Sequence, residues 1–306
     1  MANSARLAAG EPGLLSVCIV NWNTRELLAA CLAYLQAHPY CGPCQVVVVD
    51  NGSQDGSAEL VRSRFPQVRL IANETNLGYA AATNQALRAS EGELLLLLNA
   101  DTQVRPGALD ALAACLQRHP RAGAVSAHLL HADDGSLQRS VRSFPAALPM
   151  LAEALGLARL FPGWPALARY RMRHWSHDTE IEVEQPTSSA LLLRRRALQQ
   201  VGLLDQGYPP GGFWSDVDLC FRLRHADWEI WYCPQAPVVH HLGASTGRLG
   251  REKFRQSHAG LVRFHRKHYP GGRHLARRLL MSLLSWLSLW PRWAAARPRS
   301  RPREGE

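Results

Sequence analysis

The stretch that decides the fold is QVVVVDNGSQDGS, residues 45–57. Its first half is a continuous apolar run that ends on Asp50. Such runs are typical of strands buried on both faces of a parallel sheet. The segments on either side, 24–38 and 56–66, have the apolar spacing of helices, and Thr24 is placed to cap the first of them. The local pattern is therefore helix, strand, helix.

Further strands are expected in both directions from this stretch, at 15–20, 68–73 and 93–101, with another helix at 79–92. Strands that alternate with helices over some hundred residues predict an α/β fold with an open, mostly parallel sheet flanked by helices. In such sheets ligands bind beyond the carboxyl ends of the strands. Polar residues follow these strands directly, and we expect them to converge: Asn21, Asn23, Asp50, Asn73–Asn76 and Asn99–Asp101.

The second half of the chain has a less regular pattern. Residues 144–175 are apolar and interrupted by proline, which predicts short helices or a mobile flap. Residues 184–205 indicate a strand followed by a helix. Residues 213–241 indicate a helix, a turn at Asp227-Trp228 and a strand.

The charge of the chain is concentrated at one end. The 306 residues have a net charge of +10, but the part from Arg248 onward holds 15 Arg or Lys against three Glu. The remaining 247 residues hold 20 basic and 22 acidic groups, so the body lacks the positive groove of a nucleic-acid enzyme. The tail is the part that we expect to face an anionic partner.

The N-terminus has no apolar stretch of signal-peptide length, which predicts a cytoplasmic protein. Seven irregularly spaced cysteines do not form a disulfide framework. Arginine makes up 33 of the 35 basic residues, which is typical of a GC-rich bacterial genome.

The motif Cys41-Gly-Pro-Cys44 raises the alternative of a redox dithiol. In thioredoxin-like proteins this motif lies at a helix N-terminus, which lowers the thiol pKa. Here a strand follows Cys44 directly, so a turn with Gly42-Pro43 at its centre is the favoured interpretation.

Asn99 and Asp101 follow the predicted central strand immediately. A hard divalent cation that bridges two phosphates needs few protein ligands, because water and phosphate oxygens supply the rest, so one carboxylate here suffices. The alternative is an ordinary turn in which Asp101 caps the segment that follows.

Taken together, several motifs carry a resemblance to a known family. SVCIVNWNTRELLAACLAYL, VVVVDNGSQDGS, NLGYAAATNQAL and LLLLLNADTQV occur in the order and at the spacing seen in the N-terminal half of family 2 glycosyltransferases, inverting enzymes with the GT-A fold. DGSLQRSVRSFP, LLLRRRALQQVGLLD and FWSDVDLCFRLRHADWEIWYCPQAPVVHHLGAST resemble the rhamnosyltransferase-like branch. The resemblance covers residues 15–270.

The resemblance implies roles for individual residues. Asp101 matches the metal-binding acid of the Asp-x-Asp motif and would hold Mg²⁺ or Mn²⁺, together with His240 or, as the less favoured choice, His241. Without the family context, the alternative for either histidine is a hydrogen-bonded residue at a strand end. The expected nucleotide-sugar contacts are Asn21, Asp50, Asp55, Asn76, Asn84 and Asn99, the last of which replaces the first Asp of the motif.

Asp216 matches the family's catalytic base, which takes the proton of the acceptor hydroxyl. The usual Glu before this Asp is Ser215 here, and this departure concerns how the acceptor is held. Asp218 is expected to be a structural hydrogen-bonding group.

The C-terminal segment has an apolar arc if it is helical: Leu279, Leu280, Leu283, Leu284, Leu287 and Trp290. This run is shorter than the roughly 20 residues that cross a bilayer. With its basic flanks it predicts a helix that lies in an anionic membrane surface. The alternative is a helix docked on the catalytic domain.

We therefore expect a flexible N-terminus at 1–14 and a glycosyltransferase domain at 15–270, with a nucleotide-binding half at 15–125 and an acceptor half at 126–270. A basic amphipathic helix and tail follow at 271–306. The expected activity is metal-dependent inverting transfer of a sugar to a lipid-linked or cell-envelope glycan at the inner face of the cell membrane. The donor expected as first choice is dTDP-rhamnose, which supplies L-rhamnose. The alternatives are a UDP- or GDP-sugar donor, a non-catalytic nucleotide-sugar-binding protein, and a thioredoxin-like oxidoreductase.

Overall fold

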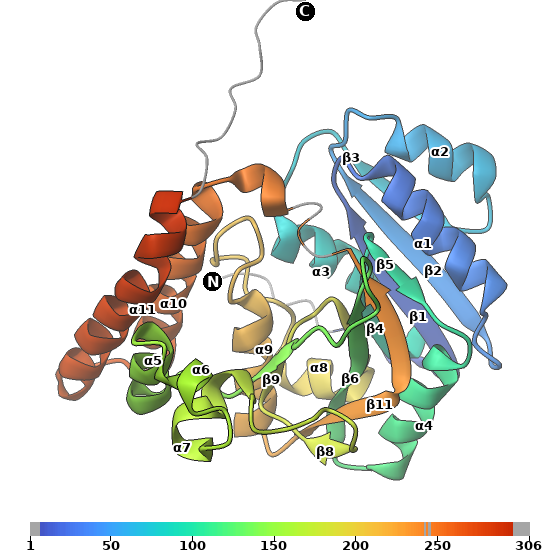
Figure 1. Cartoon of the computed structure of the whole chain (residues 1–306). Helices are drawn as coiled ribbons and strands as arrows, with labels where there is room; N and C mark the ends of the chain where they lie inside the picture. The colour runs from blue at the N-terminus through green and yellow to red at the C-terminus, as the bar shows by residue number, and fades with distance from the viewer. Residues whose placement is uncertain (1–6, 242, 244–245, 296–306) are drawn as a thin grey trace, which may run out of the picture.

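The computed structural model describes residues 7–241, 243 and 246–295, and a nine-stranded mixed sheet forms the centre of this part of the chain (Figure 1). The strand order is β3-β2-β1-β4-β10-β6-β11-β5, and β8 pairs with β11. Strands β7 and β9 form a separate two-stranded sheet. The strands are β1 (Glu11–Asn21), β2 (Cys44–Asn51), β3 (Arg69–Asn73), β4 (Gly92–Asn99), β5 (Thr102–Val104), β6 (Ala122–His131), β7 (Val141–Arg142), β8 (Ile181–Glu182), β9 (Gln185–Pro186), β10 (Ala190–Arg194) and β11 (Glu229–His240).

The helices lie on both faces of this sheet and in a separate group at one side (Figure 1). The α-helices are α1 (Arg25–Ala37), α2 (Ser57–Arg64), α3 (Tyr79–Ala89), α4 (Ala108–Arg118), α5 (Ala147–Ala154), α6 (Leu157–Leu160), α7 (Pro165–Ala168), α8 (Arg195–Val201), α9 (Ser215–His225), α10 (Glu252–His268) and α11 (Leu275–Ala295). Three short 3₁₀ turns complete them: η1 (Arg169–Arg171), η2 (Thr246–Leu249) and η3 (Gly272–His274).

The N-terminal half is the predicted parallel sheet. Strands β3, β2, β1 and β4 all run in the same direction, with Asn21 opposite Asp50 and Val20 opposite Asn99. Strand β1 begins at Glu11, upstream of the expected boundary at residue 15. Thr24 stands at the N-cap of α1 as predicted, but its hydroxyl donates to the side chain of Asn21 rather than to the helix.

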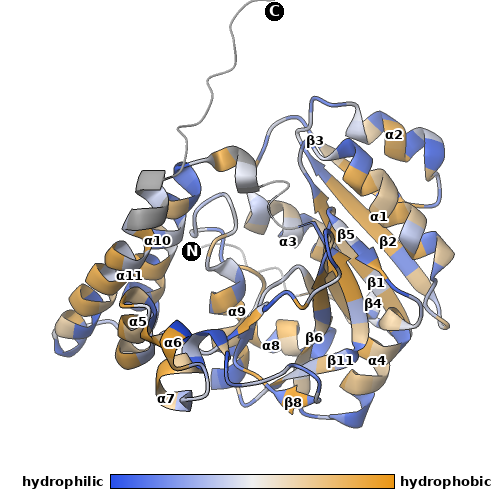
Figure 2. Ribbon diagram, in the orientation of Figure 1, coloured by the Kyte–Doolittle hydropathy of each residue, from blue (hydrophilic) through white to orange (hydrophobic). Residues whose placement is uncertain are grey.

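Alternate residues of the central strands enter two different cores, as the period of two in a strand requires. On β4, Leu96 and Leu98 pack with α1 and α4, whereas Leu95 and Leu97 pack on the other face with α3 and α8. Each fully buried leucine stabilises the fold by about 1.5–3 kcal/mol. Figure 2 shows the resulting apolar strands between amphipathic helices.

Three strands run against the others: β5 near the end of the first half, and β8 and β10 in the second half. Strand β10 is antiparallel to both β4 and β6, and β5 is antiparallel to β11. Because β10 is reversed, its first residues lie beside the carboxyl end of β4, where Asn99 N–H donates to the Ser189 carbonyl at 3.0 Å. The reversed strand therefore delivers a new segment to the edge where ligands are expected.

The proline-interrupted segment forms the short helices α5, α6 and α7, as one of the two predictions had it. Helix α5 contacts α11, and α11 packs along α10 (Figure 1). Met150, Tyr170, Leu261, Met281 and Leu284 form a small core that joins these elements.

Candidate active site

The carboxyl ends of β1 and β2 are joined by buried polar side chains. Asn21 Nδ2 donates to Asp50 Oδ1 at 2.8 Å, and the Ser53 hydroxyl donates to the same oxygen at 2.6 Å. Asn21 and Asp50 are only 0% and 2% exposed. The predicted convergence of these two strand ends is confirmed.

The neighbouring loops, after β2 and β3, are in contact as well. Asn51 Nδ2 donates to Asn76 Oδ1 at 2.9 Å, and Asn73 Nδ2 donates to Asn51 Oδ1 at 3.1 Å. Gly52, with φ at +75°, allows the close approach, since a Cβ there would lie 2.6 Å from the backbone carbon of Thr75. Asn76 is exposed and borders the open edge of the sheet.

Two other residues predicted to bind the nucleotide have structural partners. Asp55 accepts hydrogen bonds from the backbone N–H groups of Arg25 and Ser57, at the starts of α1 and α2. Burial alone would raise the pKa of Asp55, but these hydrogen bonds and that of the Ser57 hydroxyl lower it. Asn84 exchanges two hydrogen bonds with the backbone of Leu204, at 2.8 and 3.0 Å. In this structure Asp55 and Asn84 hold the loops around the site in place.

Asp101 lies against His240, which comes from the carboxyl end of β11. His240 Nε2 is 3.3 Å from Asp101 Oδ1, and both side chains are nearly buried. Asn99 Nδ2 lies 3.4 Å from the same nitrogen. His241 points elsewhere, because its Nε2 is 3.2 Å from the amide of Gln103. Of the two candidate histidines, His240 is the one beside Asp101.

The hydrogen-bond network determines which nitrogen of His240 carries the proton. Nδ1 lies 2.7 Å from Gln138 Oε1, which can only accept, so Nδ1 carries the hydrogen and donates it. In the neutral ring, Nε2 then directs its lone pair at the Asp101 carboxylate. Two electron-rich atoms that face each other at 3.3 Å are suited to hold a bound cation.

These donors fit a divalent metal. A metal-bound histidine typically donates its other N–H to a carbonyl or carboxylate, as His240 does to Gln138. The carboxylate oxygen of Asp101 and the imidazole nitrogen suit Mn²⁺, and the carboxylate also suits Mg²⁺.

Asp216 is connected to this pair through the start of β10. The backbone N–H of Ser188 donates to the Asp216 carboxylate, and the hydroxyl of Ser189 accepts from Asn99 Nδ2 at 3.3 Å. Asn99 in turn contacts His240. A continuous set of polar contacts therefore runs between the carboxylates of Asp216 and Asp101.

Tyr79, at the start of α3, lies near both carboxylates. Its hydroxyl is 2.9 Å from the Ser188 hydroxyl. Burial, together with the negative charges of Asp216 and Asp101, raises the pKa of Tyr79 to about 12. The pKa of this one tyrosine thus responds to the charges of both Asp216 and Asp101.

Burial raises the pKa of Asp216 above its usual value. Hydrogen bonds from the N–H groups of Val217 and Ser188 and the charge of Arg142 oppose this shift without cancelling it. The Nε atom of Arg142 is buried and has no hydrogen-bond partner. Asp216 is a half-buried carboxylate within reach of the charge of Arg142.

Ser215 and Asp218 are structural. Ser215 is fully buried, and its hydroxyl donates to the Gly212 carbonyl at 2.7 Å, so it faces the loop before α9. Asp218 accepts from Arg222 and His268 and pairs with Lys267 at 2.7–2.8 Å. Burial alone would raise the pKa of Asp218, but these partners hold it well below its usual value. The expected structural role of Asp218 is confirmed.

Sequence reasoning missed five residues of this site: Gln138, Tyr79, Ser188, Ser189 and Arg142. Arg142 lies in DGSLQRSVRSFP and Tyr79 in NLGYAAATNQAL, two of the stretches that carry the family resemblance. Their types gave no signal, because Gln, Ser and Tyr are common at any surface. Only the fold brings them to the two carboxylates.

Two further groups of side chains that contain cysteine do not belong to this site. Cys41 and Cys44 are exposed and free; contact with Asp110 raises the pKa of Cys41, and desolvation by neighbouring atoms raises that of Cys44 to about 11. Raised pKa values make both thiols poor nucleophiles at neutral pH, and β2 begins at Cys44 where a redox motif would start a helix. The electrostatic basis of the redox interpretation is therefore missing.

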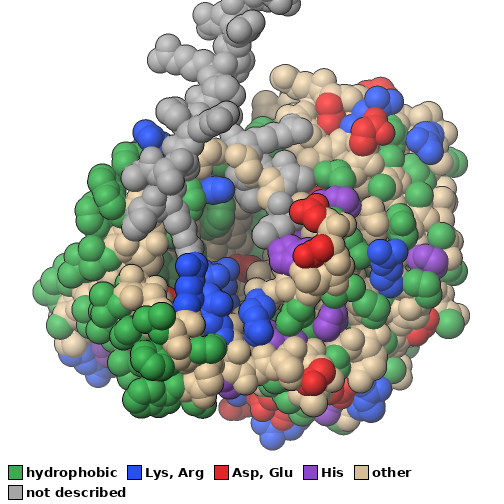
Figure 3. All heavy atoms as spheres, viewed as in Figure 1, with side chains coloured by type: hydrophobic (Ala, Val, Ile, Leu, Met, Phe, Trp, Pro, Cys, Tyr) green, Lys and Arg blue, Asp and Glu red, His purple; other side chains and the backbone are tan. Residues whose placement is uncertain are grey.

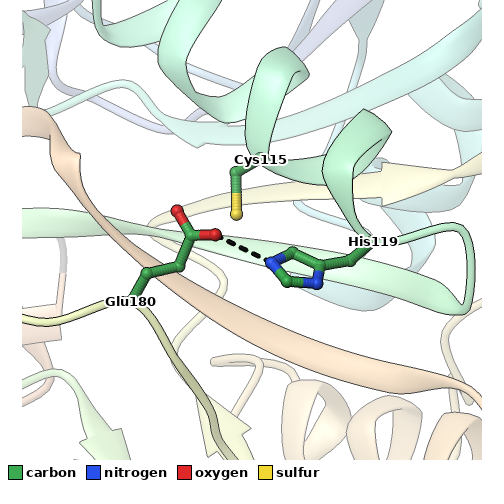
Figure 4. Close-up of side chains that lie close together, drawn as sticks. All are labelled: Cys115, His119 and Glu180. Atoms are coloured by element: carbon green, nitrogen blue, oxygen red, sulfur yellow. Dashed lines mark hydrogen bonds and ion pairs between the residues drawn. The ribbon is translucent and has the colours of Figure 1, made fainter.

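The second cluster lies between α4 and the segment before β8. Figure 4 shows Cys115 and His119, one helical turn apart, pointing toward Glu180. The carboxylate of Glu180 binds His119 at 2.7 Å with one oxygen and Arg118 at 2.5 Å with the other. Trp231 stacks on the His119 ring at 3.5 Å. These contacts form an ion-pair cluster that fastens α4 to β11 and β8.

One face of the molecule is hollowed. Figure 3 shows a hollow between the group of α5, α10 and α11 and the body of the sheet, with Lys and Arg side chains along one rim. Helix α9, whose first turn carries Asp216, lies between these two parts in Figure 1.

Comparisons with known proteins agree with this architecture. Residues 16–199 match the family described as Glycosyl transferase family 2. A Mycobacterium tuberculosis protein described as N-acetylglucosaminyl-diphospho-decaprenol L-rhamnosyltransferase is 37% identical over 218 residues, which cover 67% of this chain and 69% of the relative.

Two solved structures share the fold at low sequence identity. A mannosyltransferase from Pyrobaculum calidifontis in complex with GDP-Man and Mn²⁺ aligns with a TM-score of 0.55 at 18% identity, over 92% of this chain and 73% of its own. TarS (residues 1–349) from S. aureus aligns with a TM-score of 0.53 at 16% identity, over 90% and 72%. The expected GT-A fold, with helices α10 and α11 added at the C-terminus, is confirmed.

Proposed function

The chain belongs to glycosyl transferase family 2, and from this premise we propose that it is a metal-dependent inverting transferase acting on a lipid-linked glycan. The donor that we favour is dTDP-L-rhamnose. The description of the mycobacterial relative, a rhamnosyltransferase that acts on a diphospho-decaprenol acceptor, supports both choices. Asn21, Asp50, Asn76 and Asn99 are then placed around the nucleotide and ribose, and Asp55 and Asn84 support the loops that hold them.

One observation carries the proposal: the polar contacts that join Asp101 to Asp216 through Asn99 and the Ser188-Ser189 segment. They indicate two carboxylates at one site, supplied by the two halves of the chain. Inverting transfer needs this arrangement, because the acceptor attacks C1 from the face opposite the leaving diphosphate.

Asp216 is the proposed base. It takes the proton from the acceptor hydroxyl while the oxygen attacks C1, and the C1–O bond to the diphosphate breaks. A well-placed base contributes roughly 10²–10⁴-fold to the rate. The burial that raises the pKa of Asp216 makes its carboxylate a stronger proton acceptor than a solvated one.

Asp101 and His240 are the proposed ligands of Mg²⁺ or Mn²⁺, which supplies charge that stabilises the departing diphosphate. Gln138 fixes the His240 ring so that Nε2 faces Asp101. Asn99 brings no charge to the site, but its amide holds both Ser189 and His240.

We place the protein in the cytoplasm, at the inner face of the cell membrane, with α11 on the anionic lipid surface. Within the described residues no helix is long and apolar enough to cross a membrane. Helix α11 is docked through Met281 and Leu284, which are buried against α10 and α5, while its other side exposes leucine and tryptophan. The two interpretations of this helix are thus compatible, and the basic tail at 296–306 lies outside the described residues.

The test of the activity is transfer by the purified protein with a panel of dTDP-, UDP- and GDP-sugars, with Mn²⁺ or with EDTA. The acceptor is an N-acetylglucosaminyl-diphospho-polyprenol. We expect product only with metal present, and loss of about 10²–10⁴-fold in rate in Asp216→Asn with donor affinity unchanged. Asp227→Asn is the matched control, because Asp227 is exposed and its φ of +61° suits asparagine.

The panel also separates the alternatives. Turnover with a UDP- or GDP-sugar and none with dTDP-rhamnose would replace the donor and keep the mechanism. Donor binding without turnover in any combination would favour a non-catalytic binding protein, and unchanged turnover in Asp216→Asn would remove Asp216 from its role.

A further inference from the structure

Exposed large apolar side chains are gathered on one part of the surface. Among the described residues, Leu77 is the only strongly exposed one that lies elsewhere. Seven lie on α11: Leu275, Leu279, Leu280, Leu283, Trp286, Leu287 and Trp290. Six lie on the segment 147–168, which spans α5 to α7: Leu148, Leu151, Leu155, Leu160, Phe161 and Trp164. These thirteen residues are called the apolar face below.

The two parts of the apolar face are more than a hundred residues apart in the sequence but adjacent in space. Helix α5 contacts α11, and Met150, Met281 and Leu284 are buried between them. Figure 3 shows hydrophobic side chains covering this side of the molecule over α5–α7 and α11. Exposed side chains as large as Leu160, at 70%, and Trp164, at 60%, are costly to leave in water.

The charge around the apolar face has one sign. Residues 135–177 contain six arginines and a single acid, Glu153, and Arg171 and Arg173 already bind that acid. Residues 253–295 contain nine Arg or Lys and no acid. Arg159 lies exposed within the apolar face, and Arg278 lies in the first turn of α11.

The exposed apolar side chains and the basic residues around them together indicate what covers the apolar face. If a second copy of the chain covered the apolar face, it would bring two arginine-rich borders together, and the acids in them, Glu153 and Glu184, already pair with Arg171, Arg173 and Arg169. An anionic lipid surface neutralises such a border and takes up Leu and Trp side chains at the level of its headgroups. Trp286, Trp290 and Trp293 stack in a row along α11, at 4.8 and 5.0 Å, as aromatic residues suited to that layer.

We propose that the segment 147–168 is a second membrane-binding element, and that it and α11 form one surface that lies in the headgroup layer of an anionic membrane. This proposal rests on the proposed function only in its choice of a lipid-linked acceptor as the reason for the surface. The small core beneath it includes Tyr170 and Leu261, with Trp214 packed against it, and Trp214 is the residue before α9. The membrane-bound elements are therefore packed directly against the start of the helix that carries Asp216.

The test is co-sedimentation of the full chain with vesicles of phosphatidylethanolamine and phosphatidylglycerol, compared with phosphatidylcholine alone. Two triple variants are used: Leu155→Ser/Phe161→Ser/Trp164→Ser on the first element and Leu279→Ser/Leu283→Ser/Leu287→Ser on α11. All six side chains are exposed, so circular dichroism and thermal unfolding are expected to match those of the unmodified chain. Each triple variant should lower the vesicle partition coefficient at least tenfold, and the combined variant should not bind.

A second experiment tests the role of positive charge. It compares vesicle binding by Arg159→Gln/Arg278→Gln with that by the matched control Arg62→Gln/Arg64→Gln on α2. Only the first pair is expected to weaken binding to phosphatidylglycerol vesicles. The proposal is overturned if the 155/161/164 variant binds vesicles as the unmodified chain does, or if light scattering shows a dimer that either triple variant dissociates. Nucleotide-sugar binding is measured without vesicles, so that failure of the proposed function and failure of this proposal give different results.

Discussion

At the scale of single residues, the environment of His240 decides what the site can hold. Its proton lies on the nitrogen that faces Gln138, and its lone pair faces Asp101. The sequence could indicate Asp101 and His240, because each follows a strand and matches a family motif. It could not indicate Gln138, which reaches His240 from the loop after β6, 102 residues away.

Gln138→Leu is predicted to lower the affinity for Mn²⁺ by about 10–100-fold, because His240 loses the acceptor that fixes its tautomer. The measurement is titration of Mn²⁺ against the thermal stabilisation produced by the nucleotide sugar. Gln103→Leu is the control, since Gln103 contacts His241. Equal Mn²⁺ affinity in the two variants would count against His240 as a ligand.

The pH dependence of transfer follows from Asp216. Its pKa is raised, so the active carboxylate form is lost, as the pH falls, at a higher pH than for a free aspartate of pKa about 3.9. Arg142 lowers this pKa, and Arg142→Gln is therefore predicted to move the acid limb of the pH profile of kcat/KM upward. A limb that stays in place or moves downward would contradict the electrostatic role of Arg142.

At the scale of elements, the local patterns predicted most strands and helices but not the reversed direction of β10. Apolar runs identify β1, β2 and β4, because a strand that is buried on both faces is apolar along its whole length. The antiparallel placement of β10 depends on which strands it lies between, and this is not a local property. The Ser188-Ser189 segment was missed for that reason, although the strand that it precedes was expected.

Asp218 connects two elements, since it binds Arg222 on its own helix and Lys267 and His268 on α10. Asp218→Asn is predicted to lower the free energy of unfolding at neutral pH by about 1.5–3 kcal/mol, because the partly buried Arg222 and Lys267 lose a charged hydrogen-bond partner. The folded pKa of Asp218 is lowered, so its stabilisation is present above the unfolded value and is lost as the pH falls through the lower folded value. The deficit should therefore shrink in strong acid.

Urea unfolding across a pH series measures this difference. Glu26→Gln is the control, because Glu26 pairs with Arg25 at an exposed position, and it is expected to have little effect. A deficit for Asp218→Asn that grows as the pH falls would contradict the assignment.

At the scale of the whole molecule, the separation of charge and apolar surface gives the protein an orientation. The sequence indicated a basic end and an apolar arc on the C-terminal helix, but it gave no sign that residues 147–168 lie beside that helix. Apolar spacing cannot distinguish side chains that face a core from those that face a membrane. Leu284, which belongs to the predicted arc, is buried on α5 and α10, whereas Leu279 and Leu283 are exposed.

Vesicle binding is predicted to weaken steeply with salt, because raising the ionic strength from 0.1 M to 1 M shortens the Debye length from about 10 Å to 3 Å. Donor binding in the hollow, measured without vesicles, should change much less over the same range. Co-sedimentation at four salt concentrations gives the first quantity and calorimetry the second. If vesicle binding does not change with salt, the apolar side chains alone account for it.

The most direct test of the central claim is a crystal structure of the Asp216→Asn variant with Mn²⁺ and the nucleotide sugar that stabilises it best. The account predicts anomalous density for Mn²⁺ between Asp101 and His240 Nε2, with the sugar beyond it and the side chain at position 216 facing C1 from the side opposite the diphosphate. Mn²⁺ bound elsewhere, or a sugar that does not lie between positions 101 and 216, would contradict it.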